Sequence, residues 1–165
     1  MPAADPLSTA RNPLPPVGEL VPHAGAMRLI DELLEADAMH GLARATVRPT
    51  QLFVDDAGMP AWIGVEYMAQ TIAAWAGMRA REAGLGPVPG FLLGTRRYVS
   101  DVPAFAAGSV LTIRVQLEMA GDVAAEGGLS MFACTLAQDG REVARATVSV
   151  FVPADARAFL EGQQT

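Results

Sequence analysis

The longest apolar stretch of the chain runs from Met59 to Met78 and contains one charged side chain, Glu66. Its other residues are apolar, small or uncharged, so the stretch has no broad polar face. Pro60 is typical of the first turn of a helix, and Gly84 is typical of the position just past a helix end. The pattern predicts one helix from Pro60 to about Glu82, and a helix that is apolar nearly all round must be buried nearly all round.

After residue 90 the pattern changes to alternating apolar and polar positions, which is typical of strands buried on one face. Asp139-Gly140 lies between two such segments and predicts a tight hairpin turn. Met27–Glu35 fits a short strand and a helical turn equally well. The sequence predicts strands over Leu42–Arg48, Phe91–Val99, Leu111–Met119, Leu129–Gln138 and Glu142–Val152.

One buried helix followed by a meander of strands predicts an α+β fold, in which an antiparallel β-sheet wraps around one long central helix. That arrangement is the hotdog fold, and a less specific α+β packing is the alternative. The chain has 165 residues, which suits one domain with a sizeable core. We expect a single hotdog domain over 19–155, between a flexible N-terminal tail over 1–18 and a C-terminal tail over 156–165.

The composition narrows the classes of partner and cofactor. Hydrophobic residues make up 51% of the chain and charged residues 18%, as in a globular protein. The net charge of −6 argues against nucleic acid as the main partner, because phosphate binding needs a basic surface. Cys134 is the only cysteine, so no internal disulfide can form and a structural zinc site is not expected.

The N-terminal segment lacks the basic start and apolar run of a signal peptide, so the cytoplasm is the expected location. The Met59–Met78 stretch is long enough to cross a membrane. However, Glu66, Gln70, two glycines and the lack of basic residues on its N-terminal side favour a buried helix of a soluble protein over a membrane span.

Glu66 is the first candidate for chemistry. A carboxyl group in so apolar a stretch loses hydration, which favours its neutral form, and a neutral carboxyl can act as a general acid. The alternative is a structural ion pair with an arginine such as Arg96 or Arg97. Gln70 lies four residues later on the same helical face, where it can hydrogen-bond Glu66 or cap a neighbouring strand.

His23 is one of two histidines, and it follows Pro22 on a constrained turn. Imidazole is the usual base for removing a weakly acidic proton near neutral pH. Taken alone, His23 fits a surface or capping histidine better than a catalytic one. The second histidine, His40, lies between two predicted strands, and we expect it to be solvated.

The start of the predicted helix offers unpaired backbone donors. The N–H groups of Ala61, Trp62 and Gly64 lack partners within the helix, so they can polarise a carbonyl oxygen. Ordinary capping by Asp55 or Asp56 is the alternative.

Small residues extend the helical face that carries Glu66. Ala73 and Gly77 leave room there for a ligand or a partner helix. We expect Trp75 and Met78 to belong to the core.

These segments together resemble the hotdog 3-hydroxyacyl-acyl-carrier-protein dehydratases of bacterial type II fatty-acid synthesis. The first motif of that family is Leu-Pro-His, five to seven mostly apolar residues and then Asp. Here Val21-Pro22-His23 precedes Asp31 at the same distance. The resemblance covers roughly residues 20–152, which is nearly everything but the tails.

The second family motif is a phenylalanine, a loop, a proline and a helix with Glu-Ala-Met-Ala-Gln. Here these are Phe53, a loop, Pro60 and the run Glu66-Tyr-Met-Ala-Gln70. A later arginine–aromatic pair and Gly-Asp-x-Leu are similar to Arg96-Arg97-Tyr98 and Gly108-Ser-Val-Leu111.

The chain departs from the family pattern in four places. Ala24–Met27 replaces Arg-Tyr-Pro-Phe, Leu52–Val54 replaces His-Phe-Pro, Ala61 replaces a glycine, and a few extra residues lie between Tyr98 and Gly108. Pro-His-Ala-Gly and Ile-Gly-Val-Glu-Tyr-Met-Ala-Gln resemble more closely the dehydratase-like subgroup of aryl polyene and related polyketide-type lipid pathways. The departures therefore affect the shape of the substrate more than the chemistry.

The resemblance implies loss of water from a 3-hydroxyacyl thioester, which gives the trans-2-enoyl thioester. His23 would take the proton from C2, Glu66 would protonate the leaving C3 hydroxyl, and Gln70 would orient Glu66. The amides of Ala61 and Trp62, or that of Gly64, would hold the thioester oxygen. No metal or redox cofactor is expected, because the thioester already acidifies C2.

The resemblance also implies two protein partners. An acyl carrier protein would present the substrate on phosphopantetheine, and a second hotdog subunit, identical or related, would complete a dimer. In the family the histidine of one subunit meets the glutamate of the other. Because the carrier protein is acidic, docking needs a basic patch, for which the candidates are Arg79, Arg81, Arg96 and Arg97.

Four apolar residues are candidates for the lining of an acyl tunnel, and they suit the core equally well: Met27, Trp62, Phe91 and Leu93.

Three other functions stay open at this point. A hotdog thioesterase would use a helix carboxylate to activate water and release a free acid, with no use for His23. A non-catalytic subunit would complete a heterodimer with another dehydratase-like chain, as the changes at Ala24–Met27 and Ala61 allow. A lipid carrier would not need His23 and Glu66 together.

Overall fold

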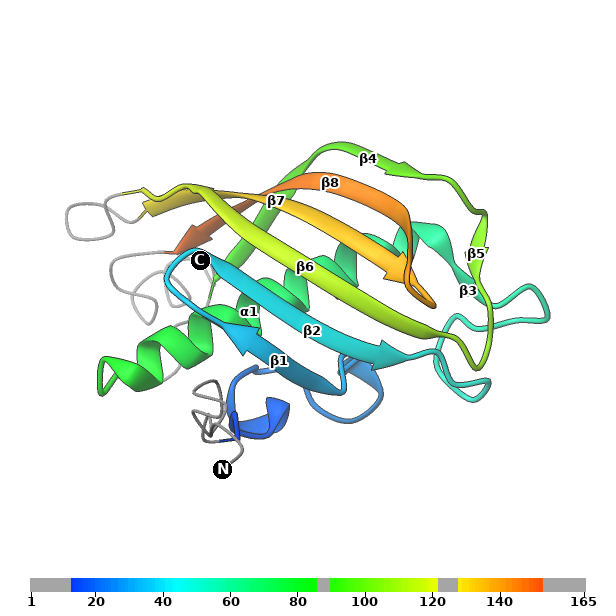
Figure 1. Cartoon of the computed structure of the whole chain (residues 1–165), viewed down its shortest axis with the longest axis horizontal. Helices are drawn as coiled ribbons and strands as arrows, with labels where there is room; N and C mark the ends of the chain where they lie inside the picture. The colour runs from blue at the N-terminus through cyan, green and yellow to red at the C-terminus, as the bar shows by residue number, and fades with distance from the viewer. Residues whose placement is uncertain (1–12, 86–89, 122–127, 153–165) are drawn as a thin grey trace, which may run out of the picture.

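A computed structural model of the chain describes residues 13–85, 90–121 and 128–152. They form a six-stranded antiparallel sheet with the order β1-β2-β6-β7-β8-β4, which curls around one long helix, α1 (Figure 1). The predicted α+β architecture, with an antiparallel sheet wrapped around a central helix, is therefore confirmed.

The strands predicted after the helix agree with the structure to within two residues, because their apolar and polar positions alternate clearly. The short strands β3 and β5 pair with each other beside the helix start and have no signal in the sequence. The elements of the described chain are β1 (Glu32–Ala36), β2 (His40–Thr46), β3 (Met59–Pro60), α1 (Gly64–Glu82), β4 (Phe91–Ser100), β5 (Ala104–Phe105), β6 (Val110–Met119), β7 (Gly128–Gln138) and β8 (Arg141–Val152), with short 3-10 turns at Val17–Glu19, Gly25–Met27 and Ala61–Ile63.

Helix α1 begins later than predicted and ends where predicted. Pro60 belongs to β3, and a 3-10 turn separates it from the α-helix. At the other end, Gly84 has a φ of 71° and its N–H donates to the Arg81 carbonyl, while the Leu85 N–H donates to the Ala80 carbonyl at 2.8 Å. These two bonds are the usual way in which a glycine stops a helix.

The core lies between α1 and the concave face of the sheet. Tyr67, Met68 and Ile72 point from the helix into this layer, and each is at most 3% exposed. Ile113 and Leu136 are fully buried on the facing strands. Fully burying one such side chain contributes about 1.5–3 kcal/mol, so this layer supplies much of the stability.

The domain begins earlier than expected. Val17 is only 3% exposed and belongs to the hydrophobic core, so the end of the predicted tail over 1–18 is part of the fold. The predicted C-terminal tail over 156–165 lies outside the described residues. No helix in the described part of the chain is long and apolar enough to span a membrane.

Candidate active site

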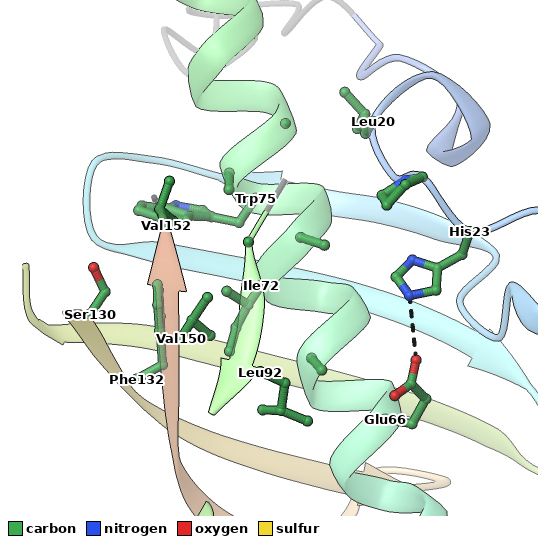
Figure 2. Close-up of a pocket in the computed structure, with 16 residues that line it drawn as sticks. Leu20, His23, Glu66, Ile72, Trp75, Leu92, Ser130, Phe132, Val150 and Val152 are labelled. Atoms are coloured by element: carbon green, nitrogen blue, oxygen red, sulfur yellow. Dashed lines mark ion pairs between the residues drawn. The ribbon is translucent and has the colours of Figure 1, made fainter. Parts of the chain in front are cut away.

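A pocket of about 320 Å³ lies along α1, between the segment that carries His23 and the ends of β4, β7 and β8 (Figure 2). Its lining combines two titratable side chains, His23 and Glu66, with mainly apolar ones. The volume is at the lower end of the range for small-molecule sites. The apolar lining includes Leu20, Ile72, Trp75, Leu92, Phe132 and Val150.

His23 and Glu66 meet at this pocket. The His23 Nε2 atom is 3.5 Å from Glu66 Oε1, and Figure 2 shows the imidazole and the carboxylate pointing toward each other. Both residues belong to the same chain, although they are far apart in the sequence. Within one chain the two groups already meet, and the implied meeting of a histidine from one subunit with a glutamate from the other stays a prediction.

Glu66 is less buried than the sequence predicts. Its side chain is 39% exposed. The reason is geometric: the sheet covers the helix face that carries Tyr67 and Met68, whereas Glu66 points the other way, into the open pocket. Within the described chain no arginine pairs with Glu66, so the structural ion pair considered above is not found.

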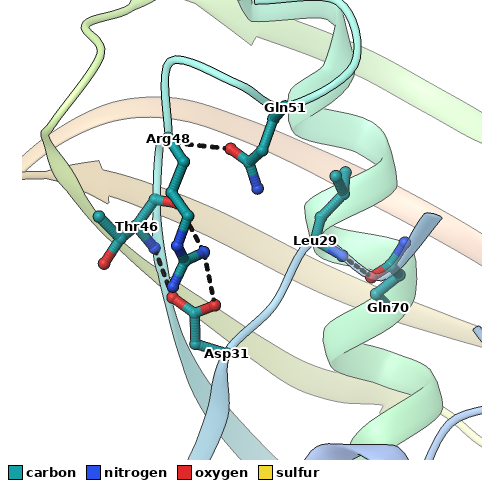
Figure 3. A network of polar contacts seen from close by, with 6 residues as sticks. All are labelled: Leu29, Asp31, Thr46, Arg48, Gln51 and Gln70. Carbon is teal, nitrogen blue, oxygen red and sulfur yellow. Dashed lines mark hydrogen bonds and ion pairs between the residues drawn. The ribbon is translucent and has the colours of Figure 1, made fainter. Parts of the chain in front are cut away.

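Gln70 ties the helix to the segment that follows His23. Its side chain is fully buried, and its Nε2 donates to Glu66 Oε1 at 2.9 Å and to the Met27 carbonyl at 2.8 Å. Its Oε1 accepts from the Leu29 N–H at 2.8 Å, as Figure 3 shows. The sequence left open whether Gln70 contacts Glu66 or caps a neighbouring strand. The structure shows the contact with Glu66, and the backbone groups that Gln70 binds belong to the segment before β1 rather than to a strand.

Gly77 has a role that the sequence did not reveal. A side chain at this position would overlap the carbonyl oxygen of Leu20. Ala73 and Gly77 both line the pocket, so the room predicted for a ligand is present. On its other side, Gly77 packs against the main chain of the segment that leads to Pro22 and His23, and no partner helix lies there within the described chain. The close approach of two backbones needs a residue without Cβ.

The donors at the start of the helix are mostly occupied. The Ala61 N–H donates to the Pro103 carbonyl at 3.0 Å, and the Gly64 N–H donates to the Ala61 carbonyl. Trp62 is the second residue of the 3-10 turn, where the amide has no carbonyl within the turn to bind. These residues do not line the pocket, and neither Asp55 nor Asp56 caps the turn.

A second polar network holds the start of β1. Asp31 Oδ2 accepts from the Thr46 N–H at 2.8 Å, and Asp31 Oδ1 is 2.9 Å from Arg48 Nη1 (Figure 3). This hydrogen bond raises the pKa of the Arg48 guanidinium above its usual value. Asp31 does not line the site pocket, so this family-motif residue positions the chain rather than contacting a ligand there.

The predicted lining of the acyl tunnel is wrong for three residues. Met27, Trp62 and Leu93 are exposed and lie outside both the pocket lining and the core. The side chain of the fourth, Phe91, lies outside what the structure describes. Trp75, expected in the core, is partly buried, packs against the core and also lines the pocket. An apolar residue on a helix suits a core or a pocket, so the sequence carries no signal that separates them.

Of the four candidate arginines for a basic patch, two are neutralised. Arg79 is 3.3 Å from Glu82, and Arg81 is 2.9 Å from Glu19. Arg96 and Arg97 are exposed on β4, at a bulge where Arg97 has a φ of 54°, and neither forms an ion pair with another described residue.

His40 and the second pocket lie away from His23 and Glu66. His40 is exposed, as expected, and its Nδ1 is 3.3 Å from Asp37 Oδ1. The described side chains contain no group of three or more His, Cys, Asp or Glu residues that could hold a metal ion. A second pocket beside β1 contains neither His23 nor Glu66.

Comparison with solved structures identifies neighbours of the fold. A chain of the dehydratase heterocomplex ApeI:P from Xenorhabdus doucetiae superimposes with a TM-score of 0.80 at 25% identity, over 92% of this chain and 99% of that one. A hypothetical thioesterase with coenzyme A from Streptococcus pneumoniae TIGR4 gives a TM-score of 0.53 at 19% identity, over 73% of this chain and 84% of that one. Thioesterase superfamily member 2 from Mus musculus gives a TM-score of 0.54 at 11% identity, over 73% of this chain and 80% of that one. The two thioesterases show the shared hotdog fold alone.

Comparison of the sequence gives the family. Curated proteins provide no match. The family model described as ApeP dehydratase, of the ApeP-like family, matches residues 15–161, a range that includes both His23 and Glu66 and all the described strands. Fold, pocket and sequence agree, and the chain belongs to the ApeP-like dehydratase family.

Proposed function

We propose that this protein removes water from 3-hydroxyacyl thioesters on an acyl carrier protein and releases trans-2-enoyl thioesters, in fatty-acid or aryl polyene and polyketide-type biosynthesis. One observation carries the proposal: His23 Nε2 and Glu66 Oε1 lie 3.5 Å apart on one pocket. A base and an acid side by side are what an elimination of water requires. Membership of a dehydratase family supports this reaction over the alternatives.

His23 acts as the base. Its Nε2 takes the proton from C2, the electrons of that C–H bond form the C2=C3 double bond, and the C3–O bond breaks. For Nε2 to accept a proton, the neutral ring must carry its hydrogen on Nδ1. Nδ1 is buried and has no hydrogen-bond partner among the described residues.

Glu66 acts as the acid. Gln70 donates to Oε1, so that oxygen is held as an acceptor. Oε2 makes no hydrogen bond within the described chain, which leaves it to carry the proton that the C3 hydroxyl receives as it leaves as water. A positioned acid or base typically contributes about 10² to 10⁴-fold to the rate.

The thioester oxygen needs a donor as negative charge develops on it. Because the Ala61 and Gly64 amides are engaged within the chain, the Trp62 amide is the donor left from the proposed set, at the helix start four residues before Glu66 and outside the lining of the described pocket. Removing such a donor typically costs about 10² to 10³-fold in rate. No metal or redox cofactor is part of the proposed reaction.

Two partners follow from the proposal. The structural likeness to a chain of the ApeI:P heterocomplex supports a dimer with a related hotdog subunit, with a homodimer as the alternative. The buried His23 Nδ1 without a partner is consistent with a site completed by a second subunit. Arg96 and Arg97, on the strand that also carries the pocket residue Leu92, are the proposed contact for the acidic carrier protein.

The test is incubation with a panel of 3-hydroxyacyl carrier proteins, followed by mass spectrometry of the carrier. We expect the loss of one water, abolished in His23→Ala and Glu66→Gln. The matched controls are His40→Ala and Glu82→Gln, which alter a histidine outside the pocket with a 43% exposed side chain and an exposed helix glutamate. A released free acid would assign a thioesterase instead. A folded chain that reacts only after a related subunit is added, with His23→Ala no less active, would assign a non-catalytic subunit.

A further inference from the structure

We infer that Trp75 closes the end of the pocket that is remote from His23 and Glu66 and sets the largest acyl group that the site accepts. This inference rests on the proposed function, because it assigns the substrate range of the same pocket. It uses a residue that neither the sequence motifs nor the proposed chemistry assigns a role.

Trp75 and the proposed acid lie in one continuous pocket. Trp75 follows Glu66 by two and a half turns of α1, which places it roughly 13 Å further along the helix axis. Both residues line the pocket, and Figure 2 shows Trp75 beside Val152, away from the imidazole of His23 and the carboxylate of Glu66. Trp75 and Glu66 lie on opposite sides of the helix, and the helix face between them lines the pocket with Ala69, Ile72 and Ala76. An acyl group whose C2 and C3 lie at His23 and Glu66 reaches the indole by crossing that face.

Three contacts hold the indole in place. Its Nε1 donates to the Asp37 carbonyl at 2.8 Å. Its ring meets that of Phe132 edge to face, with the centroids 5.4 Å apart and an interplanar angle of 75°. A side chain fixed by a hydrogen bond and an aromatic contact from two different elements acts as a wall rather than as a mobile gate.

Gly41, in β2, provides the third contact, on the side of the indole that faces away from the pocket. A Cβ added at Gly41 would lie 3.1 Å from Trp75 Cβ and 3.2 Å from Trp75 Cδ1. The indole thus packs directly against β2, in space that the glycine leaves free. Removing the indole opens this space to the pocket as an apolar cavity, and such cavities accept apolar ligands.

The structure therefore predicts opposite effects for two substitutions. Trp75→Ala lengthens the pocket, so the preferred acyl chain becomes longer. Gly41→Ala places a methyl group closer to Trp75 and to Val115 than ordinary packing allows, so we expect the indole to shift slightly away from β2, toward the pocket. The preferred acyl chain then becomes shorter.

The experiment measures kcat/KM for 3-hydroxyacyl carrier proteins of increasing chain length with wild type, Trp75→Ala, Trp75→Phe and Gly41→Ala. Leu85→Ala is the control, because this exposed residue lies outside the pocket. We expect the ratio of kcat/KM for long over short chains to rise about tenfold or more in Trp75→Ala, as for changes of a methylene or more in an apolar pocket. The ratio falls in Gly41→Ala and is unchanged in Leu85→Ala.

Binding separates this inference from the proposed reaction. Acyl-pantetheine amides of the same lengths, which lack the C3 hydroxyl, report the size of the pocket whether or not the chain dehydrates anything. A folded Trp75→Ala protein with the wild-type length profile in binding and in activity overturns the inference. If that variant does not fold, Trp75→Phe and Gly41→Ala decide: shifts to longer and shorter chains support the inference, and unchanged profiles overturn it.

Discussion

The two faces of helix α1 are held by different kinds of contact. On the sheet side, Tyr67 and Met68 pack against apolar strands, and their contribution depends on volume and shape. On the pocket side, Gln70 makes three hydrogen bonds to defined atoms, and Gly77 admits a carbonyl where a Cβ would not fit. One face secures the helix, and the other uses that fixed helix to place Glu66 against His23. Substitutions on the two faces should therefore separate stability from activity.

The largest effect on stability is expected on the sheet side, in Met68→Ala. Met68 is fully buried, and removal of a large core side chain typically lowers the free energy of unfolding by about 2–5 kcal/mol. Urea unfolding measures this change, with the exposed Met39→Ala as the control, which should stay within about 0.5 kcal/mol of wild type. The folded fraction should keep its kcat/KM, and a folded but inactive Met68→Ala would remove the distinction between the faces.

Gln70→Leu tests the pocket side. It leaves the Leu29 N–H and the Met27 carbonyl without their buried partner, and each such loss costs about 1–3 kcal/mol of unfolding free energy. Because Glu66 also loses its anchor, kcat should fall on the order of 10²-fold.

The control for that variant is Gln51→Leu. Gln51 also accepts one backbone N–H at 2.8 Å, from Arg48, but it is partly exposed and far from the pocket. Water can replace its bond, so a small stability change and an unaltered kcat are expected. An equal loss of kcat in the two glutamine variants would show that the position of Gln70 is unimportant.

Arg48→Met probes a polar contact without a role in the pocket. It removes the ion pair with Asp31, whose partners are 51% and 31% exposed. Surface pairs of this kind contribute at most about 1 kcal/mol. The difference in unfolding free energy from wild type should shrink as NaCl is raised, because salt screens exposed charges. A large decrease in the free energy of unfolding that does not change with NaCl would show that the Arg48–Asp31 pair behaves as a buried ion pair instead.

The smallest effect is expected from Tyr67→Phe. The Tyr67 hydroxyl is buried and has no hydrogen-bond partner within the described residues, so its removal should change the free energy of unfolding at pH 7 by less than about 1 kcal/mol. Burial raises the pKa of Tyr67 to about 12 from 10.0. A raised pKa means that stability from the neutral phenol is full below pH 10 and is lost as the pH rises toward 12.

The same variant should therefore lose less stability than wild type between pH 10 and 12. The free energy of unfolding of each protein, measured at a series of pH values from 10 to 12, reports this difference. Tyr98, whose pKa burial also raises to about 12, remains in both proteins and provides the common background. Parallel curves would show that Tyr67 does not titrate in this window.

The sequence predicts the framework well because its signals are local. The apolar stretch around Glu66 predicts the helix, alternation predicts β4 and β6 to β8, and Gly84 predicts the helix end. The hairpin at Asp139-Gly140 follows for the same reason, since both residues have positive φ. These features depend on neighbours in the sequence, which a single chain displays directly.

The candidate site depends on contacts between distant segments, so the sequence predicts its members better than their geometry. The motifs correctly single out His23, Glu66 and Gln70 as residues that meet. The exposure of Glu66 and the occupied Ala61 amide depend on which face the sheet covers and on the place of Pro103, and no local pattern encodes either. Gly77 packs against Leu20, and Trp75 packs against Gly41. Both contacts join segments that are far apart in the sequence, so no local pattern predicts them.

In the structure one chain supplies both His23 and Glu66 to one site, and we expect the same in the active protein. The direct measurement is dehydration by His23→Ala and Glu66→Gln proteins that are co-expressed, so that mixed dimers can form. Wild type at the same concentration should convert the substrate, and each variant alone and the mixture should not, because no single chain in the mixture carries both groups. Recovery of a substantial share of wild-type activity in the mixture would show that the two groups come from different subunits and would contradict the account.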